Sequence, residues 1–275
     1  MSKKFFRYKA FERIFRQSED SEEVVNRVEN KIKYHNTDAY ERNSATQLWW
    51  CSTDSEEEYK KNLEERPDML KQYGWLDSNI NYDLNQYGFR EDEFKESPTS
   101  WVAAGECFTF GTGLTETMTW PTMLEYKTGK KVWNLGLPLA PLDVTFRVLY
   151  AWLPIIRPEK LLLLESSQLA REVWVDEKPE PIGFWLTDEN DSWKKSLASD
   201  KVERYISRQK NLMAINELCV QLDIELHTIS ALERHELGVK AWESGEGEPY
   251  AVCRDLMHPG FHFQKAITER WLEGL

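Results

Sequence analysis

Short apolar runs alternate with amphipathic segments over the second two-thirds of the chain. The apolar runs predict strands over residues 101–106, 131–137, 160–165 and 224–229. Helical spacing of apolar positions predicts helices over residues 119–128, 141–156, 200–221 and 262–273. The run Lys160-Leu-Leu-Leu-Leu-Glu165 is uninterrupted, as is typical of a central parallel strand. Strands separated by helices predict right-handed crossovers and a three-layer α/β/α fold around a parallel sheet.

The pattern before residue 97 is different and predicts a mainly helical N-terminal extension, residues 1–96, to an α/β domain at residues 97–275. One or two amphipathic helices are expected before residue 35, a strand at 46–52 and a helix at 54–73. Asn and Gly make the following stretch irregular. The simpler interpretation is that this extension covers the core domain; a role in covering a substrate or binding a partner is the alternative.

Composition narrows the function classes. The 275 residues carry a net charge of −12, which argues against non-specific binding to nucleic acid or anionic membranes. No apolar stretch is long enough for a transmembrane helix, and the first residues do not form a signal peptide. Four cysteines without CxxC spacing predict free thiols in the cytoplasm or in a particle, such as a virion, assembled there. His258 and His262 lack further nearby ligands, so we expect no metal and no cofactor.

Three short motifs follow or precede the predicted elements: Gly105-Glu-Cys-Phe-Thr109, Asn134-Leu-Gly136 and Asp255-Leu-Met-His258-Pro-Gly260. A nucleophile in an α/β enzyme commonly stands where a strand runs through a sharp turn into a helix. Cys107 occupies such a turn. Because the carboxyl ends of parallel strands share one edge of the sheet, Cys107 and Gly136 should be neighbours. A His three residues after an Asp, in the loop before the last helix, can reach the same edge.

These motifs resemble those of the SGNH/GDSL hydrolases, in particular SGNH-like proteins of phages and marine bacteria. The resemblance covers residues 97–275 and extends to Thr119-Trp-Pro121 and to Gly88-Phe-Arg90. It implies a flavodoxin-like α/β/α fold and an esterase-type triad. The nucleophile would be Cys107, the general base His258 and the orienting carboxylate Asp255. The backbone N–H groups of Cys107 and Gly136 would then form most of the oxyanion hole.

The sequence departs from the family pattern at two places. Cys107 stands where the family has serine, and we expect its pKa to fall beside a His or a helix N-terminus. After the third strand, Glu165-Ser-Ser-Gln168 replaces the family's Gly-x-Asn-Asp. Ser166, Ser167 or Gln168 could supply the missing oxyanion donor. Arg171 is a candidate anchor for a substrate carboxylate or phosphate, with a salt bridge to an acid as the simpler interpretation.

The resulting hypothesis is an ester hydrolase or acyl transferase that proceeds through an acyl–Cys107 intermediate. Small acyl esters or O-acylated carbohydrates are the substrates that the resemblance implies. The alternative is a catalytically weak or inactive SGNH-fold protein that binds glycans or serves as a structural component of a virion or another assembly. A nucleotide-binding flavodoxin-like domain is disfavoured because Glu106 is a poor neighbour for phosphate. The sequence indicates no oligomeric state.

Overall fold

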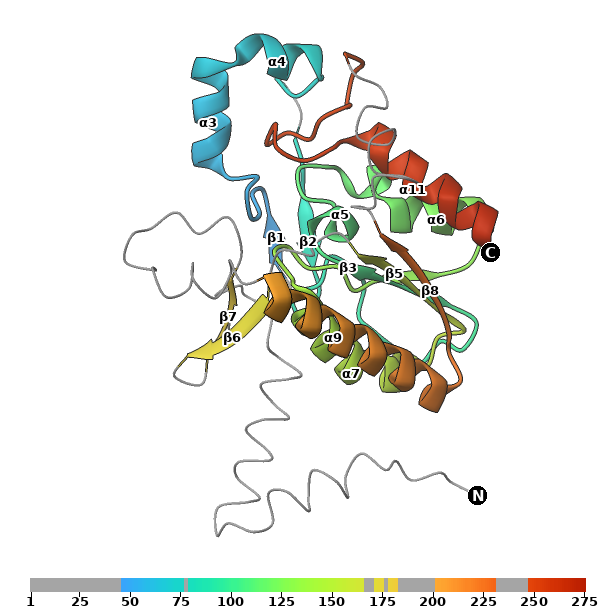
Figure 1. Ribbon diagram of the computed structural model, residues 1–275. Coiled ribbons are helices and arrows are strands. Elements are labelled where there is room, and N and C mark those ends of the chain that lie inside the picture. The colour runs from blue at the N-terminus through green and yellow to red at the C-terminus, as the bar shows by residue number, and fades with distance from the viewer. Residues whose placement is uncertain (1–45, 77–78, 166–170, 176–177, 183–200, 231–246) are drawn as a thin grey trace.

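The computed structural model describes residues 46–76, 79–165, 171–175, 178–182, 201–230 and 247–275. Four strands form a parallel sheet in the order β4-β3-β5-β8 (Figure 1). They are β3 (Trp101–Gly105), β4 (Val132–Asn134), β5 (Lys160–Glu165) and β8 (Glu225–Ser230). All four strands predicted for this domain are therefore present. The order reverses between β3 and β5, and ligands of open α/β sheets bind at such a switch point.

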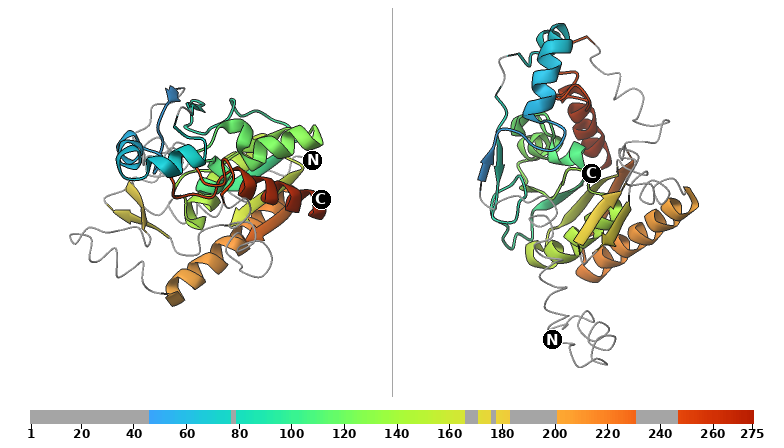
Figure 2. Two further views of the ribbon diagram at one scale, coloured as in Figure 1. Left: turned by 90° about the horizontal axis from the view of Figure 1, so that it is seen from above. Right: turned by 90° about the vertical axis from the view of Figure 1, so that its left-hand side faces the viewer.

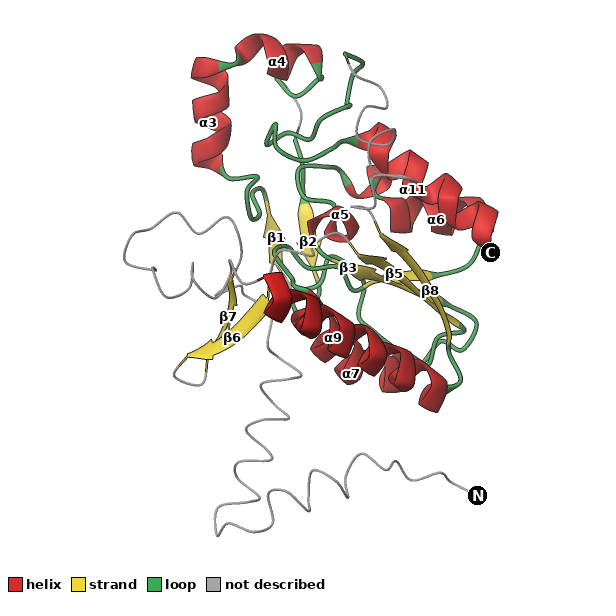
Figure 3. Ribbon diagram, in the orientation of Figure 1, coloured by secondary structure: helices red, strands yellow, loops and turns green. Residues whose placement is uncertain are grey.

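Helices cover both faces of this sheet, as Figure 3 shows. Alternate side chains of β3 and β5 point to opposite layers. Val102 and Leu163 pack toward α7 (Leu142–Ile156) and α9 (Lys201–Leu222). Ala103 and Leu162 pack toward α6 (Trp120–Thr128) and α11 (Phe261–Gly274). The three-layer α/β/α architecture predicted from the sequence is confirmed.

Only the second half of α9 packs as its spacing predicted. Ile215, Leu218 and Cys219 are buried in the core beneath the sheet. Val202 and Tyr205, assigned to the same apolar face, are 69% and 62% exposed. The physical reason is the length of α9, which has 22 residues. Its first turns extend beyond the carboxyl ends of the sheet strands (Figure 2).

Before the sheet, β1 (Thr46–Leu48) pairs antiparallel with β2 (Tyr82–Leu84). The single helix predicted for residues 54–73 is instead two helices, α3 (Glu56–Glu65) and α4 (Pro67–Gln72). Pro67 causes the break, because proline disfavours a helical conformation in the residue before it and removes one backbone donor. The helices expected before residue 35 lie outside the described residues.

The described residues before 97 share a core with the α/β layers. Cys51, Leu70, Trp75 and Tyr82 pack in one cluster with Phe110, Leu114, Cys253 and Leu256. The Trp75 indole also donates to the Val252 carbonyl at 2.7 Å. Residues 46–96 therefore do not form a separate layer, and their contacts lie beside the two segments that carry the Cys107 and His258 motifs.

A hairpin lies between β5 and α9 along the chain. It consists of β6 (Arg171–Val175) and β7 (Lys178–Ile182), with Trp174 opposite Pro179. Pro179 and Pro181 lie two residues apart on an edge strand, which is where strands tolerate proline. Short η1 (Glu116–Met118) and one-turn α5 (Cys107–Phe110) complete the described elements.

Candidate active site

Cys107 is the first residue of α5, directly after β3 and the turn at Gly105 and Glu106. Gly105 has φ +154°, and a Cβ there would lie 2.4 Å from Thr109 Oγ1 and 2.6 Å from the Leu164 carbonyl. No larger residue fits this turn without displacing backbone. The strand therefore delivers Cys107 to the carboxyl edge of the sheet, beside the switch point between β3 and β5.

Arg90 holds the far end of α5. Its buried guanidinium donates to the carbonyls of Gly111 at 2.9 Å and Leu114 at 3.0 Å, and it lies 4.5 Å from the centre of the Tyr82 ring. A cation at a helix C-terminus satisfies carbonyls that the helix leaves unpaired. The Gly88-Phe-Arg90 segment thus fixes the short helix that begins with Cys107.

His258 and Asp255 form the second half of the site. His258 Nδ1 lies 2.6 Å from Asp255 Oδ2, and Asp255 Oδ1 accepts the backbone N–H groups of Met257 at 3.0 Å and His258 at 3.1 Å. His258 and Cys107 also lie close enough for each to shift the pKa of the other. With Nδ1 directed at the carboxylate, Nε2 is the nitrogen available to the sulfur. The structure thus brings together Cys107, His258 and Asp255, the three residues predicted to be nucleophile, base and orienting acid.

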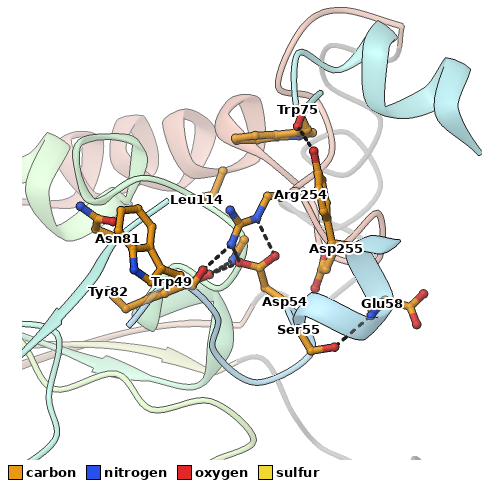
Figure 4. Close-up of polar contacts among 12 residues, drawn as sticks. Trp49, Asp54, Ser55, Glu58, Trp75, Asn81, Tyr82, Leu114, Arg254 and Asp255 are labelled. Carbon is orange, nitrogen blue, oxygen red and sulfur yellow. Dashed lines mark hydrogen bonds and ion pairs between the residues drawn. The ribbon is translucent and has the colours of Figure 1, made fainter. Parts of the chain in front are cut away.

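A buried ion pair fixes the loop that carries Asp255 and His258 (Figure 4). Arg254 donates from Nε to Asp54 Oδ1 at 2.8 Å and from Nη2 to Asp54 Oδ2 at 2.7 Å. The same Nη2 donates to the Trp49 carbonyl at 2.7 Å, and the Tyr82 hydroxyl donates to Asp54 Oδ2 at 2.6 Å. This network ties the loop to the segment before residue 97.

Thr53 is a site residue that the sequence analysis missed. Its hydroxyl donates to Asp255 Oδ2 at 2.7 Å. The two residues are 202 positions apart in the sequence, and a single Thr in a polar stretch gives no motif signal.

The backbone donors around Cys107 differ from the expected pair. The Gly136 N–H donates to the Asn134 side chain at 2.9 Å, and a Cβ on Gly136 would lie 2.5 Å from the Phe110 nitrogen. Gly136 is therefore required for close packing on α5, and its N–H is already engaged. The Leu139 N–H, at a residue with φ 57°, lies near the Cys107 sulfur and acts to lower the pKa of the thiol. An oxyanion hole made by the Cys107 and Gly136 N–H groups stays a prediction, and the Leu139 N–H is a further donor at this place.

Glu165, at the end of β5, begins the segment of residues 165–168 in which a substitute oxyanion donor was expected. Its side chain is buried, and it pairs with both Nε and Nη2 of Arg208 on α9. A cavity of about 10 Å³, roughly one water, lies beside it and beside Gly105, Glu106 and Thr145. Ser166, Ser167 and Gln168 lie outside the described residues, and of Arg171 only the backbone, at the start of β6, is described.

The pKa of the Cys107 thiol is raised, contrary to the expectation that it would fall. Burial is the main cause, and the charge of Glu106 adds to it. The hydrogen bonds from His258 and Leu139 act in the opposite direction but do not outweigh burial. Cys107 is therefore a neutral thiol at pH 7, and the one-turn helix after it offers too little dipole to change this.

The pKa of His258 lies well above its ordinary value. Burial lowers it; the charge that Cys107 carries once its thiol is ionised raises it, and so does the hydrogen bond to Asp255. For Asp255, burial raises the pKa, while hydrogen bonds from His258, the Met257 N–H and Thr53 bring it below its ordinary value. Asp255 is thus ionised at neutral pH.

The raised pKa of Cys107 predicts that the rate of its alkylation increases with pH. We expect the rate of alkylation by iodoacetamide to rise about tenfold per pH unit from pH 7 toward 9, because only the thiolate reacts. Peptide mass spectrometry at several pH values measures this for each cysteine. Cys253, buried and with its own pKa raised well above the ordinary value by burial, is the internal control and should react more slowly throughout. A fast rate that is flat between pH 6 and 8 would contradict the raised pKa.

Within the described ranges, no group of three or more His, Cys, Asp or Glu side chains is placed to hold a metal ion. His262 points away from His258, with Nε2 at 3.2 Å from the Pro249 carbonyl. In the same part of the chain, no helix combines the length and apolar content that crossing a membrane requires.

Comparisons of the sequence with protein-family models and with curated proteins found no match. Among solved structures, the fold is similar to that of a protein assigned to the G-D-S-L family from Desulfitobacterium hafniense DCB-2. The identity is 13%, the TM-score 0.33, and the match covers 64% of this chain and 99% of the other. A GDSL-like protein from Bacteroides ovatus ATCC 8483 matches with 17% identity and a TM-score of 0.34, over 72% of this chain and 56% of that one. The site described above rests on this chain's own geometry.

Proposed function

We propose that this protein is an SGNH-type ester hydrolase or acyl transferase that works through a covalent acyl–Cys107 intermediate. One observation carries the proposal. Asp255 Oδ2 lies 2.6 Å from His258 Nδ1, and the same imidazole lies close enough to Cys107, at the carboxyl edge of a parallel sheet, to lower the pKa of its thiol. A thiol, a base and an orienting carboxylate in series are the components that nucleophilic acyl transfer requires.

The reaction starts from the neutral thiol. As the Cys107 sulfur attacks the ester carbonyl, its proton passes to His258 Nε2, and the Asp255 carboxylate stabilises the imidazolium. The tetrahedral oxyanion then collapses, the bond to the alcohol oxygen breaks, and His258 returns the proton to that oxygen. Water attacks the thioester with His258 again taking a proton, which restores the thiol and releases the acid. In a transferase, an acceptor hydroxyl replaces the water.

Backbone N–H groups would stabilise the oxyanion. Those of Cys107 and Leu139 lie at the sulfur, and Gly136 would join them only if its N–H left the Asn134 side chain. One donor of this kind stabilises the transition state by roughly 3–4 kcal/mol, so the number of N–H groups that reach the oxyanion strongly affects the rate. Small acyl esters and O-acylated carbohydrates are the proposed substrates, with the acyl carbonyl at Cys107.

A catalytically weak or inactive protein that binds glycans or builds an assembly is the second candidate. The raised pKa of Cys107 favours it, because burial leaves very little thiolate at neutral pH. The engaged Gly136 N–H supports it as well.

Hydrolysis of p-nitrophenyl acetate and butyrate distinguishes the two candidates. We expect the unmodified protein to hydrolyse both esters, Cys107→Ser to retain turnover, and Cys107→Ala to lose about a thousandfold or more. A silent parent beside an active Cys107→Ser variant would favour the weak or inactive protein. Silence in all three would contradict hydrolysis of these esters and favour the binding or assembly role.

A further inference from the structure

The Asp255 carboxylate receives four hydrogen bonds, and one of them comes from a distant segment. Oδ1 accepts the backbone N–H groups of Met257 and His258, and Oδ2 lies 2.6 Å from His258 Nδ1. The fourth donor is the Thr53 hydroxyl, at 2.7 Å from Oδ2. Of these four, Thr53 alone stands outside the loop of residues 255–258. The Thr53 hydroxyl therefore fixes the position of the Asp255 carboxylate relative to the rest of the protein.

The position of Thr53 is itself fixed by short-range contacts. Cys51 and Asp54 exchange backbone hydrogen bonds at 2.8 Å and 3.2 Å, which closes a tight turn with Ser52 and Thr53 at its centre. Ser52 takes the left-handed conformation, φ 59°, that this turn requires. The next residue, Asp54, is held by the buried Arg254. The turn at residues 51–54 and the Asp54–Arg254 pair thus fix the position of the Thr53 hydroxyl beside Asp255.

The hydroxyl also lies close to the imidazole. Thr53 Oγ1 is 3.5 Å from His258 Nδ1, so both groups bind the same carboxylate oxygen from neighbouring directions. Within the described part of the chain, six further charged or titratable groups lie around the Asp255 carboxylate. His258, Cys107 and Glu106 belong to the site itself. Asp54, Arg254 and Cys253 belong to the neighbouring buried residues. Apart from His258, none of these groups donates to Asp255 Oδ2 among the described contacts.

We propose that Thr53 is a positioning residue of the catalytic site, whose hydroxyl holds the Asp255 carboxylate in the orientation that His258 needs. The segment before residue 97 thereby completes the site built by the α/β domain. A hydrogen bond from a neutral donor to a carboxylate stabilises its charged form, so Thr53 also keeps Asp255 ionised. The catalytic consequence rests on the proposed function, whereas the effect on Asp255 does not.

The test compares Thr53→Val, Thr53→Ser and Ser55→Ala. Valine keeps the shape of threonine without the hydroxyl, and serine restores the hydroxyl. Ser55 is the matched control because its side chain caps α3 in the same segment, accepting the Glu58 N–H at 3.0 Å, without contacting Asp255. Carboxyl-carbon NMR of aspartate-labelled protein, with Asp255→Asn for assignment, measures the pKa of Asp255. Hydrolysis of p-nitrophenyl acetate measures kcat/KM, and the midpoint of thermal unfolding measures stability.

We expect Thr53→Val to raise the pKa of Asp255 and to lower kcat/KM about tenfold, the effect of one hydrogen bond to a charged group. Thr53→Ser should return both to the parent values. Ser55→Ala should lower the unfolding midpoint and leave the Asp255 pKa unchanged. The proposal is wrong if Thr53→Val leaves that pKa as in the parent, or if Ser55→Ala raises it equally. If the parent hydrolyses no ester, the NMR result still decides the role of Thr53, and only the proposed function fails.

Discussion

Replacing His258 by alanine should lower kcat/KM for p-nitrophenyl acetate by about a thousandfold or more. The thiol of Cys107 is neutral because burial raises its pKa, so attack requires a base at the moment of reaction. In the proposed mechanism the imidazole held by Asp255 is that base, and no other side chain near Cys107 among the described residues is assigned this role. The loss should appear in kcat, because the imidazole acts in the chemical step.

His262→Ala is the matched control for this change. His262 lies four residues later, at the start of α11, and its ring is directed at the Pro249 carbonyl and the Glu248 carboxylate. Its removal should change kcat/KM by less than about twofold, as is usual for a half-exposed side chain without a catalytic contact. A His258→Ala variant that keeps about a tenth or more of the parent activity would exclude His258 as the general base.

The second large effect concerns stability. Arg254→Leu should lower the free energy of unfolding by about 3–5 kcal/mol, because it leaves the Asp54 carboxylate buried without its counter-charge. The side chains of Arg254 and Asp54 are only 3% and 1% exposed. The arginine also lies 4.0 Å from the centre of the Trp50 ring, so the variant loses a cation–π contact as well. Urea unfolding followed by tryptophan fluorescence measures the change.

An exposed ion pair of the same segment provides the comparison. Lys60 and Glu56 lie on α3 at 2.6 Å, with side chains 66% and 51% exposed. Lys60→Ala should leave the free energy of unfolding nearly unchanged, because solvent screens such pairs. If Arg254→Leu cost as little as Lys60→Ala, the buried network would not hold the loop of Asp255 and His258, and the support for the site would need another source.

The sequence was sufficient for the α/β layers because their periodicity is strong. The run Lys160–Glu165 coincides with β5, and the Gly-x-Cys turn after β3 places Cys107 at the sheet edge. The family resemblance implied the contact of Asp255 with His258, and the structure contains it: Asp255 bonds both the backbone and the side chain of the residue three positions on. These features follow from local sequence patterns, which are visible in a single sequence.

The remaining features depend on distant contacts. Thr53 meets Asp255 only because β1, β2 and α3 pack on the loop of residues 247–260, and no local signal announces that packing. The prediction that the pKa of Cys107 would fall was wrong, because the shift depends on burial beneath neighbouring segments. The sequence showed only the nearby His and helix. Leu139 could not be predicted as a backbone donor because its left-handed conformation is unusual for leucine.

The central claim is that Cys107 carries the acyl group, and intact-protein and peptide mass spectrometry test it most directly. The protein is mixed with p-nitrophenyl acetate, quenched in acid at short times, and digested. We predict a mass increase of one acetyl group on the peptide that contains Cys107. The peptides of Cys51, Cys219 and Cys253 should stay unmodified, and His258→Ala should slow formation of the adduct. Ester turnover without any acyl group on Cys107, or equal slow labelling of all four cysteines, would contradict the account.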